Sequence, residues 1–130
     1  MCADFKATLN DNIQADSYPL PTIEEIITRI GRSCKFAKID LMSAYSQIEL
    51  TDEAKNLSII NTHKGLFKLT RLQMGMKNSS AIFQKCIEQI LHDIPGVIIF
   101  QDDIMVHAES SRQLKKRLGQ VFGRLNDFNV

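Results

Sequence analysis

The chain has 130 residues, of which 44% are hydrophobic and 24% are charged, and its formal net charge is +1. This is the composition of one ordinary globular domain or part of one, and the near-neutral charge excludes the strong electrostatic attraction that a free-standing DNA-binding protein usually has for nucleic acid. The apolar runs are too short to cross a bilayer, no signal-peptide pattern opens the chain, and the three cysteines lack CxxC spacing, which predicts an intracellular protein with reduced thiols and no membrane contact.

The N-terminal part predicts the end of a strand, a loop and one helix. Residues 2–5 are typical of a strand end, and the polar, proline-containing residues 10–21 predict a connection. Thr22 followed by Glu25 matches a capping box, and Gly31 supplies a stop signal. The helix between them carries an apolar face made of Ile23, Ile26, Ile27 and Ile30.

The middle of the chain predicts short strands joined by polar turns. The strands are expected at residues 35–41, 47–50, 57–62 and 66–72. Asp40 lies near the end of the first strand, and residues 51–54 are expected to form a polar turn. A turn at residues 63–65 makes the last two strands a hairpin.

Two helices are predicted in the C-terminal half. Asn78 is a candidate N-cap for a helix that runs to about His92 and stops at Pro95 and Gly96. A last helix begins at about Ser110 and carries one apolar stripe, made of Leu114, Leu118, Val121, Leu125 and Phe128. Antiparallel strands with helices on one face of the sheet predict an α+β domain, and nothing in the pattern indicates a parallel, doubly wound sheet.

Between these helices, residues 96–108 predict a β-hairpin with two adjacent carboxylates at its tip. Apolar residues run into Gln101, Asp102 and Asp103 before an alternating pattern resumes. Adjacent carboxylates repel each other unless a cation or solvent screens them. If the strand that ends at Asp40 lies beside this hairpin, three carboxylates meet at one sheet edge, and such a cluster suits Mg²⁺ ions that activate an attacking hydroxyl and stabilise a leaving pyrophosphate.

The same residues also have simpler explanations. An Asp-Asp pair in a hairpin is most often a solvated turn, and a single aspartate at a strand end is more often structural. A calcium site is a poor alternative because no loop has the EF-hand spacing. From the residues alone, Tyr45 is most often a half-buried core aromatic, and Gly75 is a turn residue.

Five motifs, in order along the chain, resemble those of reverse transcriptases. They are the fingers-to-palm segments at residues 4–10 and 18–21, the first-aspartate segment at 38–48, the residues 61–67 typical of the gypsy-type long-terminal-repeat retrotransposon branch, the glycine turn and helix at 74–84, and the aromatic-x-Asp-Asp box at 100–103. The resemblance covers almost the whole chain. The chain is therefore identified as similar to a fingers and palm fragment of an RNA-directed DNA polymerase.

The resemblance implies a catalytic and metal-binding set. Asp40 and Asp102 would bridge two Mg²⁺ ions, Asp103 would complete the acidic set, and the backbone carbonyl of Leu41 would add an oxygen ligand. The implied reaction is nucleotidyl transfer, in which the 3′-hydroxyl of a primer attacks the α-phosphate of a deoxynucleoside triphosphate.

The resemblance also implies substrate contacts. Backbone amides around Ser43 and Ala44 would meet the incoming triphosphate, and Tyr45 would lie beneath its sugar, where a large ring crowds a ribose 2′-hydroxyl. Gly75 would let the backbone approach the nucleotide, and Lys6 would lie near the template strand.

The implied fold is a ferredoxin-like polymerase palm with partial fingers, in one partial domain over residues 1–130. Residues 1–33 and 51–72 would be on the fingers side, and residues 34–50 and 73–130 would form the palm. The implied partners are an RNA or DNA template with its primer, deoxynucleoside triphosphates, and polyprotein segments absent from this chain, namely the thumb, RNase H and integrase. The implied location is the cytoplasm, an element particle or the nucleus.

Some residues depart from the family pattern. Gln101 stands where the family usually has a small or apolar residue, and Ser80 replaces a proline that usually starts the following helix. Without a thumb, much of the substrate positioning on which phosphoryl transfer depends is lost, so we expect the chain alone to be inactive. The alternative is a truncated, non-catalytic remnant that folds, and binds nucleic acid weakly, but does not polymerise.

Overall fold

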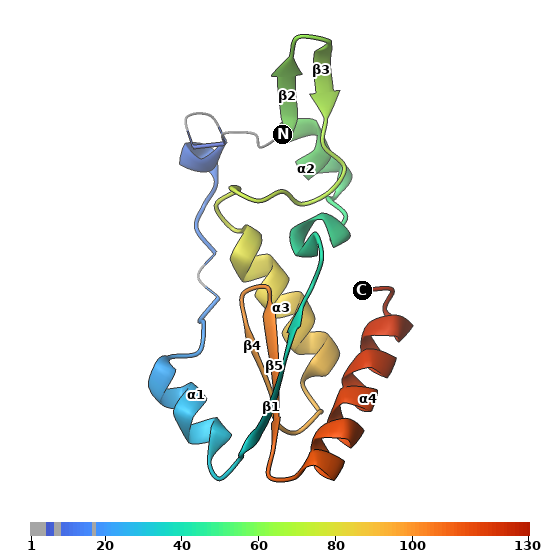
Figure 1. Cartoon of the computed structure of the whole chain (residues 1–130). Coiled ribbons are helices and arrows are strands. Elements are labelled where there is room, and N and C mark those ends of the chain that lie inside the picture. Colours follow the sequence, from blue (N-terminus) through green and yellow to red (C-terminus); the bar gives the residue numbers. More distant parts are fainter. Residues whose placement is uncertain (1–4, 7–8, 17) are drawn as a thin grey trace.

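The computed structural model describes residues 5–6, 9–16 and 18–130. Its helices and strands, shown in Figure 1, are η1 (Asn10–Asn12), α1 (Ile23–Ile30), β1 (Lys35–Asp40), η2 (Ala44–Gln47), α2 (Asp52–Leu57), β2 (Ile59–Thr62), β3 (Gly65–Lys68), α3 (Ser79–Leu91), β4 (Val97–Phe100), β5 (Asp103–Ala108) and α4 (Ser111–Asp127). The strand end predicted at residues 2–5 falls mostly outside the described residues, and Phe5 itself is not in a strand.

The centre of the molecule is a three-stranded antiparallel sheet with the strand order β1-β5-β4. Helices α3 and α4 pack together on one face of it, which confirms the predicted α+β class (Figure 1). The core between sheet and helices contains Phe83, Ile87, Leu91, Ile99, Ile104, Val106, Val121 and Leu125. In β1, the side chains alternate as expected for a sheet with one covered face, because Ile39 packs on the core while Lys38 and Asp40 are exposed.

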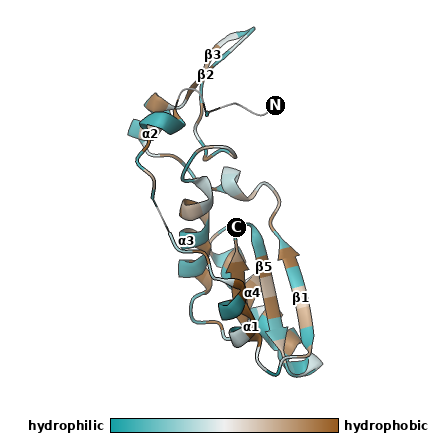
Figure 2. Cartoon of the chain, turned by 90° about the vertical axis from the view of Figure 1, so that its left-hand side faces the viewer, coloured by the Kyte–Doolittle hydropathy of each residue, from teal (hydrophilic) through white to brown (hydrophobic). Residues whose placement is uncertain are grey.

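The β2–β3 hairpin extends away from the central sheet in both views (Figures 1 and 2). It was predicted over a longer range, but its return strand ends at Lys68. One more hydrogen bond, from the Leu69 N–H to the Ser58 carbonyl, continues the register of the hairpin, and further along the Leu72 N–H donates to the Ile48 carbonyl. From Thr70 onward the chain bonds to the segment around Ile48 and Leu50, and so connects the hairpin to the rest of the fold.

Two predictions for residues 47–54 are wrong. The expected polar turn at 51–54 is the start of helix α2, because the Thr51 hydroxyl caps the Ala54 N–H and acidic residues occupy the first turn, where they favour a helix. The expected strand at 47–50 is absent from the described residues, where Glu49 forms only an isolated bridge with Arg71.

Helix α1 has the predicted capping box, in which the Thr22 hydroxyl accepts from the Glu25 N–H and the Glu25 carboxylate accepts from the Thr22 N–H. Its apolar face is largely exposed, however, with Ile23 at 76% and Ile27 at 63%. Figure 1 shows the reason, since α1 lies beside the sheet and not against the covered face.

Helix α3 begins where predicted, but Asn78 does not cap it with its side chain. The Asn78 amide instead donates to the Gln14 carbonyl and accepts from the Asp16 N–H, so it holds the N-terminal segment against the start of α3. Helix α4 begins close to where it was predicted, and the structure shows that the Ser110 hydroxyl caps it by accepting from the Gln113 N–H.

Gly96, between α3 and β4, is a position that only glycine fits. Its φ is +74°, and a Cβ there would lie 2.6 Å from the His107 carbonyl oxygen and would also meet the Arg117 side chain. We expect Gly96→Ala to lower the free energy of unfolding by about 2 kcal/mol or more in urea denaturation. A Cβ at Gly119 in α4 would meet open space, so Gly119→Ala should raise the free energy of unfolding by about 0.5–1 kcal/mol. Equal stability of Gly96→Ala and the unchanged chain would contradict this.

Candidate active site at the end of the sheet

Three aspartates from distant parts of the sequence lie at one end of the central sheet. Asp40 is the last residue of β1 and pairs in register with Asp103, the first residue of β5. Paired residues in an antiparallel sheet have Cα atoms about 4.5–5.5 Å apart, so these two backbones are neighbours. Asp102 lies in the two-residue turn between β4 and β5, directly before Asp103.

A cavity of about 400 Å³ opens beside these carboxylates. It is lined by Asp40, Leu41, Met42, Ser43, Ala44, Tyr45, Ser46, Gln73, Met74 and Asp102. Six of the residues that the sequence singled out are among them. Asp103, Gly75 and Lys6 are not lining residues: the Asp103 side chain has another partner, Gly75 lies one residue beyond the lining, and Lys6 is exposed elsewhere.

The side chain of Asp103 forms an ion pair with Lys38, two residues before Asp40 on the same exposed side of β1. The Lys38 Nζ lies 2.8 Å from the Asp103 Oδ2. The hydrogen bond and charge of Asp103 raise the pKa of Lys38, and the charges of Asp40 and Asp102 raise it further. The positive charge of Lys38 is therefore attracted by all three carboxylates and offsets part of their negative charge.

Carboxylates are the kind of ligand that a hard divalent cation takes in proteins. Oxygen ligands are what Mg²⁺ prefers, and the cavity brings together side chains of Asp40 and Asp102 with the Leu41 segment. Within the described ranges, no three His, Cys, Asp or Glu side chains are already arranged as a metal-binding group. The Asp103 carboxylate is paired with Lys38 instead.

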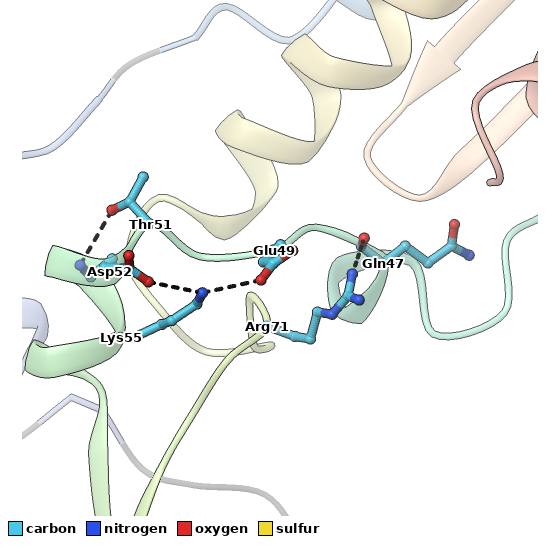
Figure 3. A network of polar contacts seen from close by, with 7 residues as sticks. Gln47, Glu49, Thr51, Asp52, Lys55 and Arg71 are labelled. Atoms are coloured by element: carbon cyan, nitrogen blue, oxygen red, sulfur yellow. Dashed lines mark hydrogen bonds and ion pairs between the residues drawn. The ribbon is translucent and has the colours of Figure 1, made fainter.

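The loop after β1 is held in a fixed shape by its own hydrogen bonds. Ser43 has φ +54°, in the left-handed region that non-glycine residues seldom adopt. The Gln47 side chain donates to the Met42 carbonyl across the loop. Figure 3 shows that Arg71 in turn donates to the Gln47 carbonyl, which ties the end of η2 to the segment after the β2–β3 hairpin. These hydrogen bonds hold both ends of the short loop in which Ser43 and Ala44 line the cavity.

Tyr45 connects this loop to the core. Its ring meets the Phe83 ring edge-on, with 5.4 Å between the ring centroids, and its hydroxyl lies 3.3 Å from the Ser80 Oγ. The residue is half-buried and also lines the cavity. Tyr45 is therefore a half-buried aromatic that packs on the core and also lines the cavity, and its contact with a nucleotide sugar stays a prediction.

Gly75 lies in the turn before α3 and has φ +92°, which explains why glycine stands there. Its carbonyl accepts a hydrogen bond from the Asn10 side chain at 2.9 Å. The structure therefore shows Gly75 as a turn residue that helps to hold the N-terminal segment.

Comparison with known proteins decides the family. Residues 2–130 match the sequence profile of the family described as reverse transcriptase (RNA-dependent DNA polymerase). The chain belongs to the reverse transcriptase family. A protein of Caenorhabditis elegans, described as uncharacterized, is 39% identical over 129 residues, covering 98% of this chain and 10% of that protein. The retrovirus-related Pol polyprotein from the Drosophila melanogaster transposon gypsy is 30% identical over 129 residues, covering 98% of this chain and 12% of that polyprotein.

A solved structure agrees with this assignment. The foamy viral protease–reverse transcriptase in complex with double-stranded DNA superposes with a TM-score of 0.87 at 25% identity, covering 98% of this chain and 22% of that one. The mixed helix and antiparallel-sheet architecture is thus the reverse transcriptase fold. The chain spans only about a tenth of the length of these curated relatives.

The sequence interpretation of this reverse transcriptase domain missed several residues at the site. Lys38 could have been found from strand alternation, since it shares a side of β1 with Asp40. Gln73 and Met74 also line the cavity; Met74 begins the 74–84 segment that resembles the family, and Gln73 directly precedes it. Among the described residues, no helix is both long and apolar enough to cross a membrane.

Proposed function

We propose that this chain is the palm and part of the fingers of an RNA-directed DNA polymerase, with residues 1–33 and 51–72 on the fingers side. The observation that carries the proposal is the register pair of Asp40 and Asp103, with Asp102 in the adjoining turn, at the edge of a cavity in a chain of this family. Three carboxylates at one edge of a sheet repel one another, and cations bound between them would offset this repulsion.

In this proposal, Asp40 and Asp102 hold two Mg²⁺ ions, the Leu41 carbonyl adds a ligand, and Asp103 completes the set when its carboxylate leaves Lys38. When bound, the ions supply charge that lowers the pKa of a primer 3′-hydroxyl and neutralises the phosphates. The carboxylates fix where that charge lies relative to the cavity. The fixed backbone at residues 43 and 44 presents amide donors to the triphosphate.

Tyr45 is the residue of the same cavity that would distinguish a deoxyribose from a ribose by its shape. Its ring is held by Phe83 and so cannot easily move aside for an extra hydroxyl on the sugar. We propose that it lies beneath the deoxyribose and crowds a ribose 2′-hydroxyl. Gly75 and Lys6 do not line the cavity. We propose that, once substrate is bound, Gly75 contacts the nucleotide and Lys6 contacts the template.

The proposed substrates are deoxynucleoside triphosphates and an RNA or DNA template with its primer, and the foamy viral neighbour's DNA complex supports a nucleic-acid partner. The proposed setting is intracellular, in the cytoplasm, an element particle or the nucleus. Because phosphoryl transfer depends on held geometry, we propose that polymerisation requires the thumb and further polyprotein segments.

Nucleotide binding tests the proposal without those segments. We expect the chain to bind dTTP in the presence of Mg²⁺, to lose most of that binding when Mg²⁺ is removed, and to bind UTP more weakly than dTTP. Tyr45→Ala should narrow the difference between dTTP and UTP. Binding that is independent of the ion would contradict the proposed site, and efficient primer extension by the chain alone would contradict the requirement for a thumb.

Lys38 gives a prediction about the cation itself. It competes with a metal ion for Asp103, so Lys38→Met should tighten binding of Mn²⁺, a paramagnetic stand-in for Mg²⁺, by about two- to fivefold, as expected for an exposed charge pair. Electron paramagnetic resonance measures this directly. Lys35→Met, at the other end of β1 opposite Ala108, should leave the affinity unchanged. Weaker binding by Lys38→Met would show that the lysine supports the site.

A further inference from the structure

The turn that carries Asp102 has an unusual backbone. Gln101 has φ +57°, in the left-handed region, where a side chain is sterically disfavoured. A two-residue turn between paired strands often needs such a residue, and glycine or asparagine usually supplies it. Because glutamine stands there, the turn needs support from outside the hairpin.

Gln84, in the middle of α3, supplies contacts to both sides of this turn. Its Oε1 accepts from the Gln101 N–H at 2.8 Å, and its Nε2 donates to the Ile99 carbonyl at 2.9 Å. Its exposed fraction is 0%. A buried glutamine that bonds to the backbone on both sides of a tight turn holds that turn at a fixed position on the helix.

A second residue of α3 fixes the glutamine. The Nε2 of Gln84 also donates to the Glu88 Oε1 at 2.6 Å, and the other carboxylate oxygen of Glu88 accepts from the Tyr18 hydroxyl at 2.5 Å. This hydrogen bond, which Tyr18 donates to Glu88, raises the pKa of the Tyr18 hydroxyl. A continuous series of hydrogen bonds therefore runs from the segment before α1, across α3, to the turn before Asp102.

We propose that Gln84 and Glu88 are positioning residues, and that Tyr18 orients Glu88. They hold the Gln101 turn so that Asp102 lies at the cavity and Asp103 lies opposite Asp40. This inference rests on the proposed function of the three carboxylates as cation ligands. The positioning role can be distinguished from a purely structural role of Gln84. Only the positioning role requires that cation affinity falls when the hydrogen bond between Gln84 and the Gln101 N–H is lost.

Two measurements on the same variants test this. The first is the hydrogen-exchange rate of the Gln101 amide, followed by NMR, which reports the bond to Gln84. The second is Mn²⁺ affinity from electron paramagnetic resonance, which reports the carboxylates. In Gln84→Met, which keeps the side-chain length but removes all three bonds, we expect amide exchange about tenfold faster and Mn²⁺ affinity about three- to tenfold weaker, as for loss of one or two hydrogen bonds.

Matched variants separate positioning from general damage to α3. Gln89→Met makes the same change at an exposed site on the same helix and should alter neither quantity. Exchanging the two groups, in a chain carrying both Gln84→Glu and Glu88→Gln, restores an acceptor for the Gln101 N–H and a donor–acceptor pair within α3. Because a carboxylate at position 84 cannot donate to the Ile99 carbonyl, the exchange should recover part of the amide protection and the Mn²⁺ affinity that Gln84→Met loses.

The outcomes decide between the alternatives. Wild-type Mn²⁺ affinity in Gln84→Met, despite faster exchange at Gln101, would overturn the inference while leaving the proposed function intact. No Mn²⁺ binding by the unchanged chain would overturn both. If Gln84→Met does not fold, Tyr18→Phe and Glu88→Gln decide in its place: each should weaken Mn²⁺ affinity and speed exchange at Gln101 by a smaller factor, and no change in either quantity would overturn the inference.

Discussion

Replacing Asp102 with asparagine should weaken Mn²⁺ binding by at least about tenfold, because a divalent cation loses one of the charged oxygens that attract it. The double replacement Asp40→Asn and Asp102→Asn should abolish binding at millimolar ion. Electron paramagnetic resonance measures free Mn²⁺ in both cases. The same variants should be at least as stable as the unchanged chain to urea without metal, because they relieve repulsion among clustered carboxylates.

The combination of those two results distinguishes a cation site from a structural turn. If the aspartates served only to form the turn, Asp102→Asn would change stability and not cation affinity. Asp93, at the other end of α3 and paired with Arg124, provides the control, since Asp93→Asn should leave Mn²⁺ affinity unchanged. Unchanged affinity in Asp102→Asn would contradict the proposed ligand role.

The largest effect on stability is expected at Phe83. Its side chain is 1% exposed, and it joins α3 to the sheet core while supporting the Tyr45 ring. Phe83→Ala should lower the free energy of unfolding by about 3–5 kcal/mol, through lost burial and the cavity left behind. For a domain whose total stability is about 5–15 kcal/mol, this is enough to bring the chain near its unfolding threshold.

Urea denaturation measures this, and the chain offers a matched control. Phe122 lies on α4 with its side chain 54% exposed, so Phe122→Ala should change the free energy of unfolding by less than about 0.5 kcal/mol. A loss below about 1 kcal/mol in Phe83→Ala would show that the space around this ring collapses on truncation and that Tyr45 is held by other contacts.

Much of the fold could be predicted because local signals and global packing agree. The capping box at Thr22, the helix start near Ser110 and the apolar stripe of the last helix up to Leu125 all depend on residues close together in the chain, whereas Phe128 at the end of the predicted stripe is exposed. The wrong predictions fell on residues whose types are compatible with two different local structures. Thr51 and the acidic residues after it suit both a polar turn and a helix start, and Asn78 suits a helix cap but bonds instead to a segment 64 residues earlier.

The site could be predicted in part for the same reason. Asp40 and the Asp102–Asp103 pair each follow apolar strands, and the family resemblance indicated that these strands meet. The sequence could not show that Lys38 binds Asp103, or that Gln84 holds the Gln101 turn, because these contacts depend on the register between strands and on the position of α3 against the hairpin. Such contacts join residues far apart in the chain and leave no local pattern.

The most direct test is to locate a bound cation by NMR. Mn²⁺ added well below one equivalent broadens the resonances of nearby nuclei. The site described here predicts that the backbone resonances of Asp40, Leu41, Asp102 and Asp103 broaden first and together, while those of Lys64 at the tip of the β2–β3 hairpin stay sharp. Broadening that begins at the exposed acidic turn of α1, at Glu24 and Glu25, and spares the end of the central sheet would contradict the shared cation site.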